Sequence, residues 1–315
     1  MTPPIELLAC PACRSALLRA GEGRFCCPTP DCPIGKPEFP SISGQPVLID
    51  FAASVVALQD VTNLSATAQD QRAQLGGSAA YRIYKRLTPG NRVAAQNAAR
   101  LLQALGQRRD PLLLVIGGGT RGAGADALWD VQNLRRLAFD IYASANTNFV
   151  ADAHRIPLRD GAVDAVWIQA VLEHVLEPAQ VVQEIERVLA ADGLVYAETP
   201  FLQHVHEGAY DFTRFTHSGH RWLFRGFEEI ASGPVGAAGA SMVWSVRHLI
   251  QAATGSRTLG RATAVAFGWL GALDRLGSPR AQLDSACGLY FLGRKSGQRL
   301  QPRDMAAYYK TEARP

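Results

Sequence analysis

Five of the six cysteines of this 315-residue chain lie between residues 10 and 32. Cys10 and Cys13 enclose a two-residue knuckle, and Cys27 and Cys32 form a second pair after a hairpin-like segment. Four thiolates on two facing turns make a tetrahedral site that suits zinc, with Cys26 in place of Cys27 as the alternative. Reduced structural thiols without metal are the simpler interpretation. The N-terminus lacks the basic start and apolar core of an export signal, so we expect metal ligands in a cytoplasmic protein rather than disulfides.

Reactive side chains also gather between residues 198 and 217, which hold three histidines, three carboxylates and one arginine. His206 is the candidate general base, because the unperturbed histidine pKa of about 6.5 suits proton removal near neutral pH. Glu207 or Asp211 would orient its ring, and Arg214 would hold an anionic group of a substrate. These four residues are the predicted catalytic set.

Two alternatives remain for the same segment. Asp211 and Arg214 stand three residues apart and are equally well explained as a structural ion pair. His204, His206 and Glu207 offer three metal-binding groups, but their spacing matches no closed metal site.

A glycine-rich turn follows an apolar run at residues 112–116, and that run is typical of a strand buried on both faces. Gly117, Gly118 and Gly119 come at once, then Gly122, and then a helix-like stretch. In a doubly wound α/β sheet such a turn brings the backbone close to a nucleotide. A plain tight turn between strand and helix is the alternative.

Three polar residues end the strand-like stretches that follow. Asp140 lies 23 positions beyond Gly117, close to the roughly 20 expected for a carboxylate that accepts hydrogen bonds from ribose hydroxyls. Asp152 ends the next stretch, and Gln169 follows the one after it. Because ligands of such sheets bind outside the carboxyl ends of the strands, we expect these side chains to share one site with the glycine turn.

The elements that must position these residues alternate between strand and helix patterns. Strands are predicted at residues 112–116, 136–140, 149–154, 161–168, 194–198, 226–230 and 286–293, and helices at 91–105, 178–190 and 218–224. Asn91 is the expected N-cap of the first of these helices, and Gly106 is its end. The alternation predicts an α/β fold, a doubly wound parallel sheet with helices on both faces.

The stretch from Leu112 to Pro200 resembles class I S-adenosylmethionine-dependent methyltransferases of the methyltransferase-11 kind. The resemblance rests on the string ADAHRIPLRDGAVDAVWIQAVLEHVLEPAQVVQEIERVLAADGLVYAETP. It implies a Rossmann-like methyltransferase sheet with an antiparallel last strand, and S-adenosyl-L-methionine as the cofactor.

The same resemblance implies the cofactor contacts. The glycine turn at residues 117–119 would approach the methionine part, and Asp140 would bind the ribose. Asp152 and the backbone of Ala153 would bind the adenine, and Gln169 would line the site.

Two positions depart from the pattern of that family. The family has an acid two residues before its first glycine, where this chain has Val115, and a glycine where this chain has Arg121. The first change removes an anchor for the loop or for the amino group of the cofactor, and the second adds a positive charge near the sulfonium. A degenerate, non-catalytic domain is therefore one alternative. A NAD-binding Rossmann domain is another, but the glycine spacing does not fit it.

The N-terminal module has a resemblance of its own. Its cysteines, together with FPSISGQPVLID, are similar to the small zinc ribbons that act as methyltransferase activator subunits or are fused to methyltransferase domains. Such ribbons are usually structural, so a Zn²⁺ ion here is expected to do no chemistry. The predicted domains are a zinc ribbon at 1–50, a helical linker and pre-core helix at 51–108, a methyltransferase domain at 109–296 with a helical insertion at 231–285, and a polar tail at 297–315.

Composition limits the partners. The net charge is +4 without any block of like charges, so no nucleic acid is expected. No apolar stretch of about 18 residues exists, so no transmembrane segment is expected. The insertion at 231–285 is predicted to cap the acceptor pocket or to form a homodimer interface, with contact to a membrane surface as an alternative. Residues 81–86 could border a ligand or form a solvated face.

These observations predict methyl transfer from S-adenosyl-L-methionine to a small-molecule or sugar-like acceptor, with His206 taking the proton. The segment that begins at His206 resembles a subgroup of bacterial methyltransferases associated with polysaccharide or other secondary biosynthesis. That resemblance does not identify the acceptor. The alternative is a non-catalytic binding or scaffold protein with a methyltransferase fold, whose zinc ribbon docks a partner.

Overall fold

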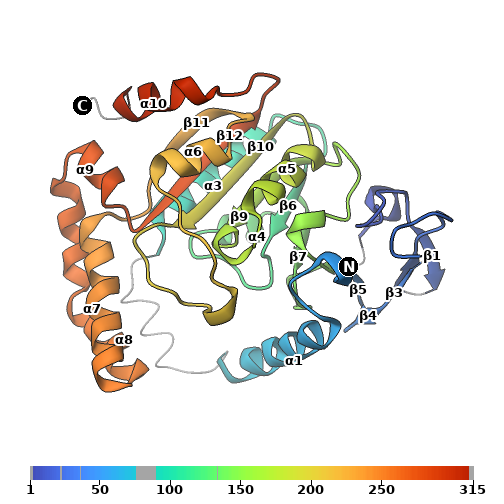
Figure 1. Cartoon of the computed structure of the whole chain (residues 1–315), viewed down its shortest axis with the longest axis horizontal. Coiled ribbons are helices and arrows are strands. Elements are labelled where there is room, and N and C mark those ends of the chain that lie inside the picture. The colour runs from blue at the N-terminus through green and yellow to red at the C-terminus, as the bar shows by residue number, and fades with distance from the viewer. Residues whose placement is uncertain (1–2, 22, 36, 76–89, 133, 312–315) are drawn as a thin grey trace.

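A nine-stranded sheet forms the centre of the protein, with the strand order β11-β12-β10-β9-β6-β7-β8-β5-β4 (Figure 1). The computed structural model describes residues 3–21, 23–35, 37–75, 90–132 and 134–311. Residues 81–86, which could border a ligand, lie outside the described residues. The strands of the sheet are β4 Ser41–Ile42, β5 Gln45–Leu48, β6 Leu112–Ile116, β7 Arg135–Asp140, β8 Phe149–Ala151, β9 Val163–Gln169, β10 Leu189–Pro200, β11 Phe227–Pro234 and β12 Gly288–Lys295.

The central strands run parallel, as the alternation of strands and helices predicted. β6 pairs with β7 and β9, β7 with β8, and β9 with β10, all in parallel register. β12 is antiparallel to both β10 and β11. The structure thus confirms the predicted fold class, an α/β protein with a mostly parallel sheet.

Helices cover both faces of this sheet because alternate residues of its buried strands point to opposite sides. Leu113 and Val115 of β6 pack in one core cluster with the buried side of α3 Arg92–Leu105. Leu114 and Ile116 pack in another with α5 Pro178–Val188. α3 begins as predicted, since the Asn91 side chain accepts a hydrogen bond from the backbone N–H of Ala94 at 2.9 Å.

The remaining helices are shorter or lie outside the core. They are α1 Leu58–Leu75, α4 Asp126–Asp130, α6 His217–Leu223, α7 Ala238–Thr254, α8 Arg257–Ala266, α9 Pro279–Asp284 and α10 Met305–Thr311. α4 is only five residues long, so the helix-like stretch after the glycine turn forms a short helix. Among the described residues, none of the helices combines the length and the apolar character needed to cross a bilayer.

The N-terminal module is joined to the large sheet. Its small sheet consists of β1 Leu18–Gly21, β2 Arg24–Cys26 and β3 Glu38–Phe39. β5 then pairs in parallel with β8, where Val47 lies opposite Val150. Val47 and Leu48 are fully buried there, which an edge strand of an isolated module would not achieve. The predicted domain boundary at residue 50 therefore assigns β5 to the N-terminal module, although this strand is part of the central sheet.

The segment predicted as a polar tail contains the helix α10. The Tyr308 hydroxyl donates to Glu229 at 3.1 Å, and that of Tyr309 donates to Asp284 at 3.1 Å. Residues 305–311 thus form a helix within the segment predicted as a tail, and these two tyrosines attach it to β11 and α9.

The insertion at 231–285 lies at the opposite end of the molecule from the cysteine module (Figure 1). Its first residues extend β11 to Pro234, and α7, α8, a 3₁₀ segment at Gly268–Leu276 and α9 follow. Many of its large apolar side chains stay exposed: Met242, Leu249, Leu259, Val265, Phe267, Trp269, Leu273 and Leu276. None of the described residues that line the cavity at the carboxyl ends of the parallel strands comes from this insertion.

Candidate functional site

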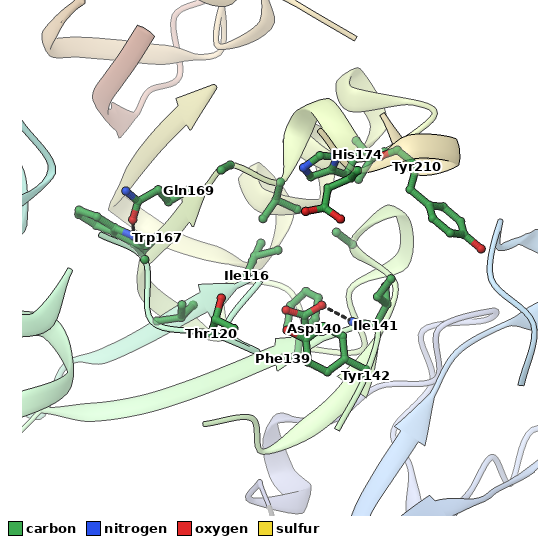
Figure 2. A pocket seen from close by; sticks show the side chains of 18 of the residues that line it. Ile116, Thr120, Phe139, Asp140, Ile141, Tyr142, Trp167, Gln169, His174 and Tyr210 are labelled. Atoms are coloured by element: carbon green, nitrogen blue, oxygen red, sulfur yellow. Dashed lines mark hydrogen bonds between the residues drawn. The ribbon is translucent and has the colours of Figure 1, made fainter. Parts of the chain in front are cut away.

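A cavity of about 590 Å³ lies at the carboxyl ends of the parallel strands (Figure 2). Residues at or near the ends of five neighbouring strands line it: Ile116 of β6, Asp140 of β7, Ala151 of β8, Gln169 of β9 and Glu198 of β10. Parallel pairing brings these strand ends to one edge of the sheet. The site is therefore a direct product of the fold, and it brings together Asp140, Gln169 and the glycine turn as predicted.

The glycine turn is shaped by close approaches that a side chain would prevent. Gly117 lines the cavity with φ at +74°, and a Cβ there would stand 2.2 Å from Cγ2 of Val171. Gly119 donates its N–H to Oδ2 of Asp140 at 2.8 Å, and its Cβ would lie 2.6 Å from that oxygen. Gly118 and Gly119 are not among the described lining residues. They act on the cavity only by allowing the backbone of the turn to follow its path.

Asp140 presents a fixed carboxylate to the cavity. Its Oδ1 accepts a hydrogen bond from the N–H of Ile141 at 2.8 Å, shown in Figure 2, and its Oδ2 accepts the one from Gly119. Burial raises the pKa of Asp140 to about 6, although both hydrogen bonds act in the opposite direction. At neutral pH this group is an anchored acceptor that can still bind hydroxyl groups.

Asp152 lines the cavity, but its carboxylate is already hydrogen-bonded to other groups of the protein. Oδ1 accepts the N–H of His154 at 2.9 Å and lies 2.6 Å from Nδ1 of that ring, and the Ser54 hydroxyl donates to Oδ2. Burial would raise the pKa of Asp152, but these hydrogen bonds outweigh it and lower the pKa. The carboxylate thus holds the backbone at Ala153, which also lines the cavity.

Gln169 belongs to a hydrogen-bonded group that sequence reasoning found only in part. Its Nε2 donates to the carbonyl of Ala123 at 3.1 Å and to Glu198 at 3.3 Å. Glu198 also accepts from Nδ2 of Asn91 at 2.7 Å and from the hydroxyl of Tyr196 at 2.9 Å. Burial raises the pKa of this carboxyl against those three hydrogen bonds. Its place near the end of β10, opposite Gln169 in the parallel register, is the signal that could have identified it.

The predicted catalytic residues lie in a loop whose side chains bond mainly to other groups of the same loop. Only Glu207 lines the cavity, whereas His206, Asp211 and Arg214 are not among the described lining residues. Asp211 accepts the backbone N–H of His206 at 2.9 Å and a side-chain N–H of Arg214 at 2.9 Å. Arg214 also donates to the carbonyls of Gln203 and His204.

The Asp211–Arg214 contact is an ion pair that stabilises the loop. The carboxylate of Asp211 is 1% exposed, and the hydrogen bonds from Arg214 hold its pKa well below the usual range. Across the loop, the rings of His204 and His248 of α7 stack at 4.5 Å, and the rings of His206 and Trp244 lie 6.0 Å apart. The insertion thus packs against this loop rather than over the cavity.

Glu173 and His174 are not among the predicted site residues, although both stand in the string that carries the family resemblance. His174 lines the cavity beside Tyr210 (Figure 2), and its Nδ1 is 2.7 Å from the carbonyl oxygen of Tyr210. Glu173 is 1% exposed, and among the described residues neither of its carboxylate oxygens has a hydrogen-bond partner. Burial raises the pKa of Glu173 to about 8.

The two departures from the family pattern have different outcomes. Val115 lines the cavity as an apolar side chain. Arg121 instead pairs with Asp130 at 3.1 Å, and its guanidinium lies 5.5 Å from the ring centroid of Trp129. Arg121 is not among the described lining residues, so the expected positive charge in the site does not arise from it.

The four cysteines predicted as metal ligands lie together in the N-terminal module. The Sγ atoms of Cys10 and Cys32 are 3.8 Å apart, and those of Cys13 and Cys27 are 3.5 Å apart. All four lie within 4.8 Å of one another, and Cys26 is outside the group. Tetrahedral zinc with bonds of about 2.3 Å requires sulfur separations of about 3.8 Å, so the cluster fits that ion.

Several solved structures are similar to this chain at low identity. One is the complex of the Haloferax volcanii Trm112 methyltransferase activator with the putative methyltransferase: 17% identity, 77% of this chain, 100% of the other, TM-score 0.44. A second is a putative sarcosine dimethylglycine methyltransferase from Galdieria sulphuraria: 16% identity, 64% and 86% covered, TM-score 0.42. A third is phosphoethanolamine N-methyltransferase 2 of Haemonchus contortus: 15% identity, 64% and 53% covered, TM-score 0.44.

No curated protein matches the chain. One family model does, and its description is a methyltransferase domain. The match covers residues 129–197, which contain β7, β8, β9 and most of β10, together with three strand-end residues of the site, Asp140, Asp152 and Gln169. This part of the chain is therefore similar to methyltransferase domains.

Proposed function

We propose that this protein transfers a methyl group from S-adenosyl-L-methionine to a small-molecule acceptor. The observation that carries the proposal is the position of Asp140. It stands at the carboxyl end of β7, bonded to the glycine turn, in a cavity about half of whose lining residues belong to the stretch that matches methyltransferase domains.

The cavity suits such a cofactor in size and chemistry. Its volume of about 590 Å³ lies within the roughly 300–1,000 Å³ of small-molecule sites. The Asp140 carboxylate would accept the ribose hydroxyls, and the apolar side chains of Phe139 and Ile141 would border the adenine next to Ala153. When bound, S-adenosyl-L-methionine supplies an electrophilic methyl group. The chain itself holds and orients the cofactor, so that proximity contributes much of the rate.

Glu198 is our candidate for the acid that the family pattern has at the position of Val115. Both residues line the cavity, and the carboxylate of Glu198 is oriented by Asn91, Tyr196 and Gln169. A carboxylate held in this way can pair with the ammonium group of a methionine moiety.

The acceptor would bind where Glu207, His174 and Tyr210 line the cavity. His206 remains the candidate base, since its ring meets the edge of the His174 ring with centroids 5.1 Å apart. Asp211 and Arg214 would act by holding the loop that carries His206 and Glu207. A sugar-like acceptor is compatible with such a polar end of the cavity.

Calorimetric titration of the zinc-loaded protein with S-adenosyl-L-methionine tests the proposal. We expect saturable binding at one site per chain, weakened tenfold or more by Asp140→Ala, because a hydrogen bond to a charged group contributes about 1.5–3 kcal/mol. Absence of binding would favour the alternative, a non-catalytic scaffold whose zinc ribbon docks a partner.

A further inference from the structure

We propose that Glu173, His174 and His206 bind one divalent transition-metal ion at the wall of the cavity. One donor atom from each side chain lies within 4.8 Å of the other two. The donor set of two imidazoles and one carboxylate is a common one for zinc, iron and manganese in proteins. The cysteine cluster is a separate group of residues in the N-terminal module.

The two histidines are oriented as metal ligands usually are. Nδ1 of His174 is 2.7 Å from the carbonyl oxygen of Tyr210, which makes this nitrogen the N–H donor and leaves a lone pair on Nε2. That Nε2 stands 3.6 Å from Oε1 of Glu173. Nδ1 of His206 likewise faces the carbonyl of His204 at 3.3 Å. A second partner on one ring nitrogen is the arrangement that orients a histidine toward a metal through the other.

Glu173 supplies an independent observation. Its side chain is 1% exposed, and both of its oxygens lack a hydrogen-bond partner among the described residues. Buried carboxylates are normally paired, hydrogen-bonded or bound to a metal. The backbone around it is firmly held, since the Glu173 carbonyl accepts the N–H groups of Phe212 at 2.8 Å and Thr213 at 3.3 Å. The backbone that carries this carboxylate is therefore held, and the carboxylate itself has Nε2 of His174 at 3.6 Å but no hydrogen-bond partner among the described residues.

A further carboxylate lies next to the cluster. Oδ2 of the buried Asp211 carboxylate is 3.4 Å from Nδ1 of His206. Arg214, the opposing cation, is engaged with Asp211 and with backbone carbonyls. Three protein ligands would leave open coordination positions on the side where His174 lines the cavity.

For the proposed methyl transfer, and resting on it, this site would bind an oxygen of the acceptor. A metal-bound hydroxyl loses its proton at a lower pH than a free one. His174 and His206 would then act as ligands, and the bound acceptor hydroxyl would release its proton to solvent water, so that no histidine is needed as the base. The acceptor oxygen would form a bond to the methyl carbon as the sulfur–methyl bond breaks, and S-adenosylhomocysteine would leave with that electron pair on its sulfur.

Titration with Mn²⁺ of the full-length protein that carries one equivalent of zinc per chain, without cofactor or acceptor, tests the site. Mn²⁺ prefers oxygen and imidazole ligands to thiolates, so cysteines that already hold zinc do not compete. We expect one saturable Mn²⁺ site per chain and a higher melting temperature on its occupation. Glu173→Gln keeps the size of the side chain and should weaken binding by about a hundredfold or more, exceeding the 10–100-fold typical of an outer-shell partner.

His206→Asn is the second test variant, because His206 lies at the surface and its replacement leaves the core intact. His204→Asn is the matched control, since His204 is two residues away and outside the cluster. Equal Mn²⁺ affinity in wild type, Glu173→Gln and His206→Asn would overturn the proposal, as would the absence of a saturable site in the wild type. Because cofactor binding is measured separately, loss of this inference leaves the proposed methyl transfer standing, and the reverse also holds.

Discussion

The two ends of the cavity are built in different ways. At the end where we propose that the cofactor binds, the polar groups stand on strand ends, and Asp140 accepts hydrogen bonds from the backbone N–H groups of Gly119 and Ile141. At the proposed acceptor end, Asp211 and Arg214 stand in a loop and are held by each other and by backbone groups of the same loop. The first end inherits its precision from the sheet, whereas the second depends on a few side-chain contacts. Changes at one end should therefore leave the other largely intact.

The largest effect is expected for Arg214→Ala. This change leaves the buried carboxylate of Asp211 without its cation, and loss of one partner of a buried pair typically costs about 3–5 kcal/mol. Because Arg214 is itself 21% exposed, we expect the lower end of that range. Chemical denaturation should reveal it, with cofactor affinity changed less than about threefold. Arg121→Ala, which breaks an exposed pair with Asp130, is the control and should cost less than about 1 kcal/mol.

Gly119→Ala should come next, and it acts at the other end. The added Cβ would lie 2.3 Å from the hydroxyl of Tyr142 and 2.6 Å from Oδ2 of Asp140, so either the turn or these two side chains must move. We expect cofactor affinity to fall by about a hundredfold, equivalent to about 2.7 kcal/mol. Gly268→Ala adds a methyl group where nothing lies within 4 Å, and it should change neither affinity nor stability appreciably. Unchanged binding in Gly119→Ala would separate the turn from the cofactor site.

Asp140→Asn should weaken the cofactor by about tenfold while keeping the shape of the site. The charged acceptor is replaced by a neutral one, and the difference between such hydrogen bonds is about 1 kcal/mol or more. Calorimetry measures it directly. Denaturation of the same variant should not show a loss of stability, because the pKa of Asp140 is raised by burial and its charged form is the less favoured one in the fold.

A smaller effect is expected from pH at the cofactor end. Asp140 titrates with a pKa of about 6, so it is mostly protonated at pH 5 and ionised at pH 7. Because the ionised form is the better acceptor, cofactor affinity should rise severalfold over that interval. The effect of Asp140 on the free energy of unfolding has the opposite sign. Because burial favours the protonated form in the folded state, the stabilisation that this group contributes is fully present below about pH 4 and is lost as the pH rises to about 6. A flat affinity profile in wild type, matching that of Asp140→Asn, would contradict the role of this carboxylate.

The place of the strand-end residues in the cavity was largely predictable from sequence because the signals for it are local. Apolar runs at β6 to β10 predict parallel strands, and polar residues at their ends predict a ligand site at one edge. The pattern found Asp140, Asp152 and Gln169, all of which line the cavity. It did not assign Glu198, whose partners Asn91 and Gln169 come from distant parts of the chain.

The acceptor end was less predictable because its side chains compete for partners. The four predicted catalytic residues have suitable chemistry. However, Asp211 and Arg214 form most of their hydrogen bonds with other groups of the same loop. Glu173 and His174 belong to the string that resembles the family, but nothing in the sequence marked them as residues of the site. Nothing local distinguishes a carboxylate that is buried without partners from one that faces water.

The sequence by itself determined the order of strands and helices, the side of the sheet that carries the ligand site and the clustering of four cysteines. These follow from periodicity and spacing, which act over a few residues. The tertiary structure alone decided that β5 joins the sheet beside β8, that α10 packs on β11 and that His206 meets Glu173 and His174. Those contacts join residues about thirty or more positions apart, and only the packing of the whole chain selects them.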